Sequence, residues 1–289
     1  MKTRICSCLV VLTLVTGLGA HPHTEKTPLA DQLGLQLWSL RDQFKADALE
    51  AMDTVVSYGI SEVETAGTAN MTPKKFKAEL VKRGLDPVSA HVPYAGLVKD
   101  FDAVLAEVQE LGSSFAMIAW IPHEGDFDRS ELEQAIKDFK EWGPKFAQHG
   151  IKFGYHPHGY EFVAGKQAGE TFLDELIQGT AGHEVYFEMD VFWIVHGGGD
   201  PVTLLRQYSD RWVSLHVKDL RKGVETGQTS GHAPATDNVV VGQGMIDWVR
   251  VISTARSIGI KHYFIEDETT DPTSNIPASL EFLRNLKLD

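Results

Sequence analysis

Four segments in the second half of the chain each join β-type residues to side chains that bind divalent cations. They are YHPHGYEF at 155–162, VYFEMD at 185–190, SLHVKD at 214–219 and YFIEDE at 263–268. Carboxylate oxygens and imidazole nitrogens are common protein ligands for such cations. One such group at the end of each of four strands predicts a single cation site at the mouth of a barrel.

Strand parity selects the ligands, because alternate residues of a strand face opposite sides. Glu188 shares a face with Asp190, and His216 shares one with Lys218. A carboxylate in a strand that is buried on both faces is costly without a partner, and a cation removes that cost for several carboxylates together. Singly, Asp190 is also explained as a helix cap and His216 as a core histidine. Taken together, they lead us to predict four metal ligands: Glu161, Asp190, His216 and Glu266.

This ligand set offers three oxygen donors and one imidazole, which favours Mn²⁺, with Mg²⁺, Co²⁺ and Zn²⁺ as alternatives. The strand-5 ligand is the least defined, since His156, His158 and Glu161 lie near the same strand end. His158 is the substitute ligand if Glu161 points away. If Glu161 binds the cation, His158 is either a proton-transfer group or a supporting hydrogen-bonding histidine.

The other half of the mouth carries residues that suit a carbohydrate. Strand-end carboxylates and imidazoles bind hydroxyl groups, and aromatic faces suit the C–H faces of sugar rings. Lys218 would stabilise an oxyanion or anchor an acidic group, or else lie solvated at the rim. For the tryptophans, core packing is the alternative. The predicted substrate-binding residues are Trp38, Glu64, His91, Trp120, Glu188, Trp193 and Lys218.

Short β-type runs alternate with helix-type segments from residue 33 onward. Eight such units, about 30 residues apart, predict one α/β domain over 32–289, a single (β/α)8 TIM barrel; a doubly wound open sheet is the alternative. The long segment 220–244 is expected to be a lid over the mouth or a mobile surface loop. We expect strands at 33–38, 61–65, 87–92, 115–120, 151–156, 184–190, 212–218 and 262–267, and helices at 45–58, 100–111 and 131–148.

The N-terminal residues have the pattern of a secretory signal. Lys2 and Arg4 precede an apolar run at 5–18, which is short for a membrane span and is followed by small residues. We predict a signal peptide at 1–20 and a tether at 21–31, with the mature chain exported to a periplasm. An uncleaved anchor is the alternative.

Composition excludes several classes of function. Both cysteines, Cys6 and Cys8, lie in the predicted signal, so the mature chain has no thiol chemistry and no cysteine-ligated zinc. That chain carries 25 Lys and Arg against 40 Asp and Glu, a formal charge of −15, which repels nucleic acid. The GxG at 241–248 lacks the strand-and-helix context of dinucleotide binding, so we expect no nucleotide cofactor. After signal cleavage we expect no membrane partner.

The motifs resemble those of the xylose isomerase-like TIM-barrel superfamily, often labelled sugar phosphate isomerase/epimerase. The resemblance covers about 33–287 and rests on YHPHGYEF, FEMDVFWIVHGGGDP, LHVKD, VGQG and FIEDE in this order. Pro157 departs from it, because the family commonly has Asn there. Carried over by position, the family's metal set falls on Glu161, Asp190, His216 and Glu266.

The resemblance implies removal of a proton from a carbon next to a carbonyl, with Glu161 or Glu266 as the base. The predicted activity is isomerisation or epimerisation of a free sugar or keto-sugar. A leaving group β to the acidic carbon would instead give a 3-keto-glycoside lyase, and a non-catalytic sugar-binding barrel is a third reading. Export disfavours phosphorylated sugars. Export, the acidic charge and the small ligand set disfavour the family's DNA endonucleases. Such folds commonly dimerise through their barrel faces, so a homodimer is one reading by analogy alone.

Overall fold

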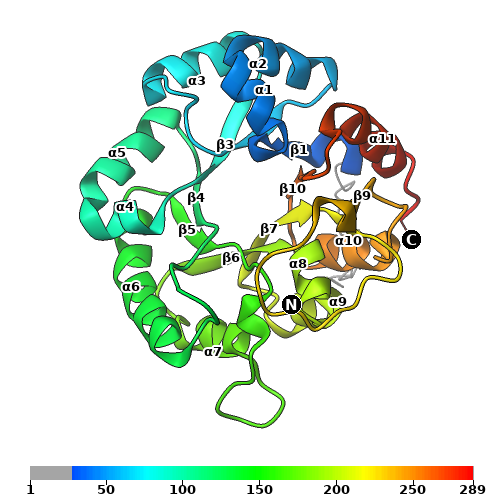
Figure 1. Cartoon of the computed structure of the whole chain (residues 1–289). Helices are drawn as coiled ribbons and strands as arrows, with labels where there is room; N and C mark the ends of the chain where they lie inside the picture. Colours follow the sequence, from blue (N-terminus) through cyan, green and yellow to red (C-terminus); the bar gives the residue numbers. More distant parts are fainter. Residues whose placement is uncertain (1–27, 289) are drawn as a thin grey trace, which may run out of the picture.

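The computed structural model describes residues 28–288, in which eight parallel strands form a closed barrel surrounded by helices (Figure 1). The strand order around the barrel is β1, β10, β7, β6, β5, β4, β3, β2, so the predicted (β/α)8 fold and its eight strands are confirmed. The strands are β1 Leu33–Gln36, β2 Glu62–Thr65, β3 Asp86–His91, β4 Phe115–Ile118, β5 Lys152–Tyr155, β6 Val185–Asp190, β7 Trp212–Val217 and β10 His262–Ile265.

The two faces of each strand carry different kinds of side chain. In β5, Phe153 and Tyr155 face the helices and pack against Phe139, with ring centroids 5.4 and 5.6 Å away. Alternate residues face the barrel axis. There Gly34 makes room for the Phe264 ring, because a Cβ on residue 34 would lie 2.7 Å from that ring. Further toward the C-terminal mouth, the inward positions become polar and form the site described below.

The helices of the outer ring lie where the apolar periodicity predicts them, with one difference. The helix expected at 45–58 is divided at Asp47, whose extended backbone ends α1. The Asp47 carboxylate then caps α2 by accepting from the backbone N–H groups of Leu49 and Glu50. The helices are α1 Arg41–Ala46, α2 Ala48–Ser57, α3 Pro73–Lys82, α4 Tyr94–Lys99, α5 Phe101–Leu111, α6 Arg129–Ala147, α7 Phe172–Gly179, α8 Val191–His196, α9 Pro201–Gln207, α10 Trp248–Ser257 and α11 Pro272–Arg284.

The described chain begins just before the barrel. The predicted signal peptide at 1–20 and residues 21–27 of the predicted tether lie outside the described residues. The end of that tether is folded, because Leu29–Gln32 form a 3-10 helix and Leu29 is buried in the core. Within 28–288, no helix is long and apolar enough to cross a membrane.

The long segment between β7 and α10 contributes to the mouth of the barrel. It contains a short antiparallel ribbon of β8 Asp219–Leu220 and β9 Asn238–Val239. The buried Asp219 carboxylate accepts from the backbone N–H groups of Gly242 and Gly244 at 2.8 and 3.1 Å, and from the Trp248 indole at 2.9 Å. These bonds hold the end of the segment against its beginning. Residues 231–233, near its middle, line the cavity at the mouth, as a lid requires.

Candidate metal centre

Four side chains from neighbouring strands meet at the C-terminal mouth, and we call them the upper group: His156, Asp190, His216 and Glu266. One ligand atom from each lies within 4.8 Å of the other three. His156 Nε2 lies 3.6 Å from Asp190 Oδ2, and His216 Nδ1 lies 3.2 Å from Glu266 Oε2. Two imidazole nitrogens and two carboxylate oxygens at such separations have the composition of a divalent-cation site.

The two carboxylate oxygens of Asp190 have different environments. Oδ1 accepts from the backbone N–H of Trp193 at 3.0 Å and caps α8. Oδ2 is buried among the upper-group atoms and has no hydrogen-bond partner in the described part of the chain. Burial and the Glu266 carboxylate raise the pKa of Asp190 to about 7 against the charges of Lys218 and His216. An unpartnered buried oxygen beside other ligand atoms fits a bound cation.

Lys218, predicted to bind substrate, lies beside the upper group and does not line the cavity described below. Its ammonium lies 3.2 Å from Glu266 and pairs with Glu268. It also lies over the rings of Phe192 and Trp193, at 5.0 and 5.1 Å from their centroids. Burial opposes the charge of Lys218, but the surrounding carboxylates outweigh it and raise the pKa of the ammonium above its usual value. The cation of Lys218 therefore offsets part of the negative charge at the mouth.

Glu161, which the sequence predicts as a ligand and a base, lies outside the upper group. Tyr155 faces the helices, and its hydroxyl donates to Glu161. The backbone N–H of His158 donates to the same carboxylate at 3.1 Å. Gly159, with φ of 86°, turns the chain into a 3-10 helix that carries Glu161 to this side of β5. His156, one of three candidates at this strand end, takes the position expected for Glu161.

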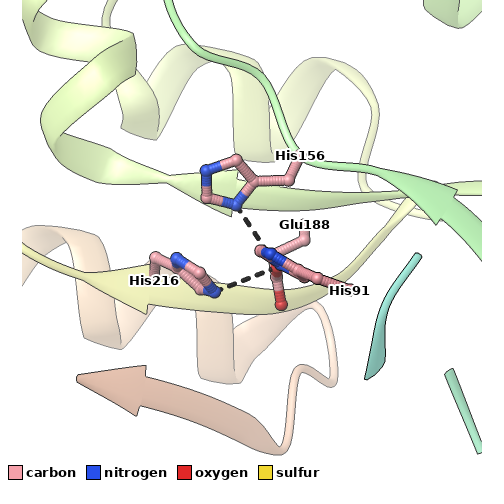
Figure 2. Close-up of side chains that lie close together, drawn as sticks. All are labelled: His91, His156, Glu188 and His216. Atoms are coloured by element: carbon pink, nitrogen blue, oxygen red, sulfur yellow. Dashed lines mark hydrogen bonds and ion pairs between the residues drawn. The ribbon is translucent and has the colours of Figure 1, made fainter. Parts of the chain in front are cut away.

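A second charged set lies one step closer to the N-terminal ends of the strands, and we call it the lower group: Glu64, His91 and Glu188. Figure 2 shows Glu188 and His91 with the two upper-group histidines, which point toward Glu188. Glu188 Oε2 lies 3.3 Å from His156 Nδ1 and 3.0 Å from His216 Nε2. Glu64 Oε2 lies 2.6 Å from His216 Nε2 and 3.1 Å from His91 Nε2. His156 and His216 therefore each direct one ring nitrogen to a carboxylate of the upper group and the other to a carboxylate of the lower group.

The two lower-group carboxylates are fully buried, and they lie beneath the histidines instead of lining the cavity where substrate was expected to meet them. The Ser214 hydroxyl donates to Glu188 Oε1 at 2.7 Å, and the Ser89 hydroxyl donates to Glu64 Oε1 at 2.5 Å. Burial disfavours the charged form of His91, but Glu64 and Glu188 outweigh it and raise the pKa of His91 to about 10. The lower group is therefore an ionic network with two fully buried carboxylates, and His91 is its member that lines the cavity.

A cavity of about 850 Å³ opens above the upper group. This volume is within the usual range for small-molecule sites. Four of the predicted substrate-binding residues line it: Trp38, His91, Trp120 and Trp193. It is also lined by His156, His158, His232, Glu266 and Glu268. A charged floor with aromatic walls is therefore available to a polyhydroxylated ring.

His158 lies in the wall of this cavity. Its Nδ1 is buried and has no hydrogen-bond partner among residues 28–288. Burial, together with the charges of His156 and Lys218, holds the pKa of His158 well below its usual value, so the imidazole is neutral near pH 7. A neutral imidazole with an unpartnered nitrogen is equipped for proton transfer.

The sequence prediction places His156 at the strand end but chooses Glu161 as the ligand, and it omits Glu268 and His232 as cavity residues. Parity identifies the first, because Tyr155 faces the helices and residue 156 then faces the barrel axis. Parity also identifies Glu268, which shares the inward face with Glu266. His232 belongs to the long loop, where no periodic pattern marks it.

Known proteins share this fold and part of this sequence. The family model described as a xylose isomerase-like TIM barrel matches residues 52–286. An inosose dehydratase from Lacticaseibacillus casei is 24% identical over 258 residues, covering 79% of this chain and 84% of that protein.

Solved structures agree with the barrel. A sugar phosphate isomerase/epimerase from Parabacteroides distasonis ATCC 8503 superposes with a TM-score of 0.72 at 24% identity, covering 88% of this chain and 98% of that one. A probable 3-DHS dehydratase from Bacillus anthracis superposes with a TM-score of 0.68 at 14% identity, covering 89% of this chain and 100% of that one. Since the family model spans nearly the whole barrel, the chain belongs to the xylose isomerase-like TIM-barrel family.

Proposed function

We propose that this protein is a divalent-cation-dependent lyase that eliminates water or an alcohol from a cyclic polyhydroxylated ketone. The observation that carries the proposal is the position of the upper group at the floor of the 850 Å³ cavity, beneath Trp38, Trp120 and Trp193. Cation ligands and aromatic faces that suit a sugar-like ring meet at this one place.

The residues that would hold the cation are those of the upper group, and the unpartnered Oδ2 of Asp190 supports this fit. A bound cation would polarise the substrate carbonyl and acidify the proton on the neighbouring carbon. Mn²⁺ stays the first candidate. The upper group contains His156 where the predicted set has Glu161, so it offers two imidazoles instead of one. This second imidazole strengthens Zn²⁺ and Co²⁺ as alternatives.

Glu266 is the proposed base. It lines the cavity from β10, and the charges of Lys218 and His216 overcome burial and hold the pKa of its carboxyl well below the usual value. His158 lies on the β5 side, with β6 and β7 between the two strands. We assign His158 to the hydrogen bond with the leaving group.

In the proposed elimination, Glu266 takes the proton from the carbon next to the carbonyl, and the C–H electron pair forms a carbon–carbon double bond. The hydroxyl or alkoxyl group on the next carbon leaves with its bonding electrons. One proton leaves the carbon and the departing group takes up one proton, so the reaction has no net proton change. The products are an unsaturated ketone and water or an alcohol. The reaction consumes no other reactant.

Elimination is favoured because the Glu266 carboxylate of the upper group and the neutral His158 imidazole both line the cavity. The predicted second carboxylate, Glu161, is held by Tyr155 instead. A base and a partner for the leaving group are sufficient for elimination. The name of the similar Lacticaseibacillus casei protein, an inosose dehydratase, supports the same reaction type and a cyclic ketone substrate.

The test is incubation of purified protein with inososes and 3-keto-glycosides, with Mn²⁺, Zn²⁺, Co²⁺ or Mg²⁺ or with a chelator. The proposal expects a product lighter by one water or one alcohol, formed only with the cation. Glu266→Gln should weaken cation binding, because Glu266 belongs to the upper group, and should abolish product formation even when the cation concentration is raised to saturate the variant. Turnover that continues in the chelator would contradict the proposal.

Isomerisation or epimerisation is the second candidate. It is favoured because Glu266 and His158 line the cavity from separate strands. Proton exchange at two positions of one substrate needs proton-transfer groups on two sides of the substrate. The same incubation in deuterated water separates the two functions. Deuterium in a ketose or keto-sugar of otherwise unchanged composition would indicate the isomerase.

A further inference from the structure

We propose that Glu188 and Glu64 are positioning residues, which determine the ring nitrogen that His156 and His216 each present to a cation. The inference rests on the proposed function, because it concerns the same cation. Neither carboxylate reaches the cavity, so contact with substrate does not explain the lower group. Positioning of the histidines gives these carboxylates a role.

The ring orientations are the first step of the argument. His156 directs Nδ1 to Glu188 at 3.3 Å and Nε2 to Asp190 at 3.6 Å. His216 does the reverse, with Nε2 2.6 Å from Glu64 and Nδ1 3.2 Å from Glu266. The two histidines would therefore bind a cation through different nitrogens.

A neutral imidazole has one N–H and one lone pair, and only the nitrogen with the lone pair binds a cation. A carboxylate accepts the N–H and so leaves the lone pair on the opposite nitrogen. Glu188 therefore selects Nε2 of His156 as the ligand atom. Glu64, with Glu188 at 3.0 Å, selects Nδ1 of His216.

The two carboxylates are themselves held in place. Ser214 donates to Oε1 of Glu188 and Ser89 donates to Oε1 of Glu64, which leaves Oε2 of each to face the histidines. Gln36 Nε2 adds a bond of 2.7 Å to Oε2 of Glu64. Both carboxylates are fully buried, and neither is able to rotate toward solvent. Such support of ligand histidines strengthens metal binding.

The alternative is a second cation in the lower group, since His91, His156, Glu188 and His216 also offer atoms within 4.8 Å of one another. Filling both places would require His156 and His216 to bind a cation through each ring nitrogen. Each ring would then lose its remaining N–H proton. With one cation in the upper group, each histidine binds the cation through one ring nitrogen and donates from the other nitrogen to a lower-group carboxylate. We therefore infer one ion per chain.

The experiment uses the full chain and titrates Zn²⁺ and Mn²⁺ by calorimetry into wild type, Glu188→Gln and Glu188→Met. Removing an outer partner of this kind typically weakens metal binding by about 10- to 100-fold, and the loss should be larger for Met, which accepts no hydrogen bond. Glu161→Gln is the matched control, because it changes a buried glutamate that belongs to neither group and that accepts from the Tyr155 hydroxyl. If Glu188→Met does not fold, Ser214→Ala loosens the same carboxylate.

A second readout separates positioning from a general structural effect. In Zn²⁺-loaded protein with ¹⁵N-labelled histidine, the shifts should show His156 bound through Nε2 and His216 through Nδ1, and Glu188→Met should mix the two forms at His156. Unchanged affinity and unchanged shifts, with turnover still dependent on the cation, would overturn only the positioning role. Two ions in the wild type would overturn it as well. No ion in the wild type would overturn the proposed function too.

Discussion

The Tyr155 hydroxyl donates to the Glu161 carboxylate, and this bond holds Glu161 on the helix-facing side of β5, away from the upper group. We therefore predict that Glu161→Gln binds Zn²⁺ or Mn²⁺ with an affinity within about tenfold of the wild type. Calorimetric titration measures this directly. A loss of more than about 100-fold would return Glu161 to the set of ligands.

Asp190 both caps α8 and lies in the upper group, and two substitutions separate these roles. Asp190→Asn keeps an oxygen for the cap but loses the charge, so cation binding should disappear without a loss of stability in the metal-free protein. Asp190→Ala should lose cation binding and also about 1 kcal/mol of unfolding free energy, the usual contribution of a cap. Metal content by mass spectrometry and denaturation with chelator present measure the two effects. Full cation binding by either variant would refute the site.

The Arg129–Glu175 ion pair predicts a pH dependence of stability away from the site. The side-chain bond from Arg129, at 2.7 Å, lowers the pKa of Glu175 to about 2 against a small effect of burial. Because the folded-state pKa is below the unfolded value of 4.5, the contribution is complete above pH 4.5 and is lost as the pH falls toward 2. Allowing for solvent screening, we expect about 1–2 kcal/mol.

The measurement is urea denaturation of wild type and Glu175→Gln at several pH values. The difference in unfolding free energy should be constant near neutral pH and shrink below pH 4.5. Glu141→Gln is the control, since Glu141 pairs with Lys145 on the surface and should show a smaller difference. A Glu175 difference that grows on acidification would contradict the sign.

Asp219 joins the two ends of the loop that lines the cavity. Asp219→Ala would leave the buried N–H groups of Gly244 and the Trp248 indole without an acceptor, at a cost of about 1–3 kcal/mol. Hydrogen exchange in 220–247 should accelerate, while exchange in the barrel strands should change little. Asp219→Asn keeps one oxygen acceptor and should show a smaller effect. Equal exchange in the wild type and Asp219→Ala would show that the loop is held by other contacts.

The sequence predicts the positions of site residues most reliably where those residues lie within continuous strands. Asp190 and His216 are neighbours in the β6–β7 register, as parity and alternation require. Glu161 follows Gly159 and lies beyond the end of β5, where a positive φ reverses the direction of the chain and parity no longer applies. His156, directly after the strand, still obeys parity.

The lower group shows a different limit of the sequence. Glu64 and His216 are 152 positions apart, and their 2.6 Å contact depends on barrel closure, which joins β2 to β7 through β1 and β10. Periodicity predicts that each side chain faces the barrel interior, but it does not predict how far each side chain lies below the mouth along the barrel axis. The sequence therefore predicts substrate contact for Glu64 and Glu188, although both are fully buried and neither lines the cavity.

The concentration of buried carboxylates at the mouth links folding to metal supply. A ligand that binds only the folded chain adds RT ln(1 + [L]/Kd), about 2.7 kcal/mol when the free ion is at 100 times its Kd. If the upper group binds its cation, the melting temperature of this barrel will rise with the concentration of that ion, with no substrate present. In a metal-poor environment, the same linkage would shorten the lifetime of the folded protein.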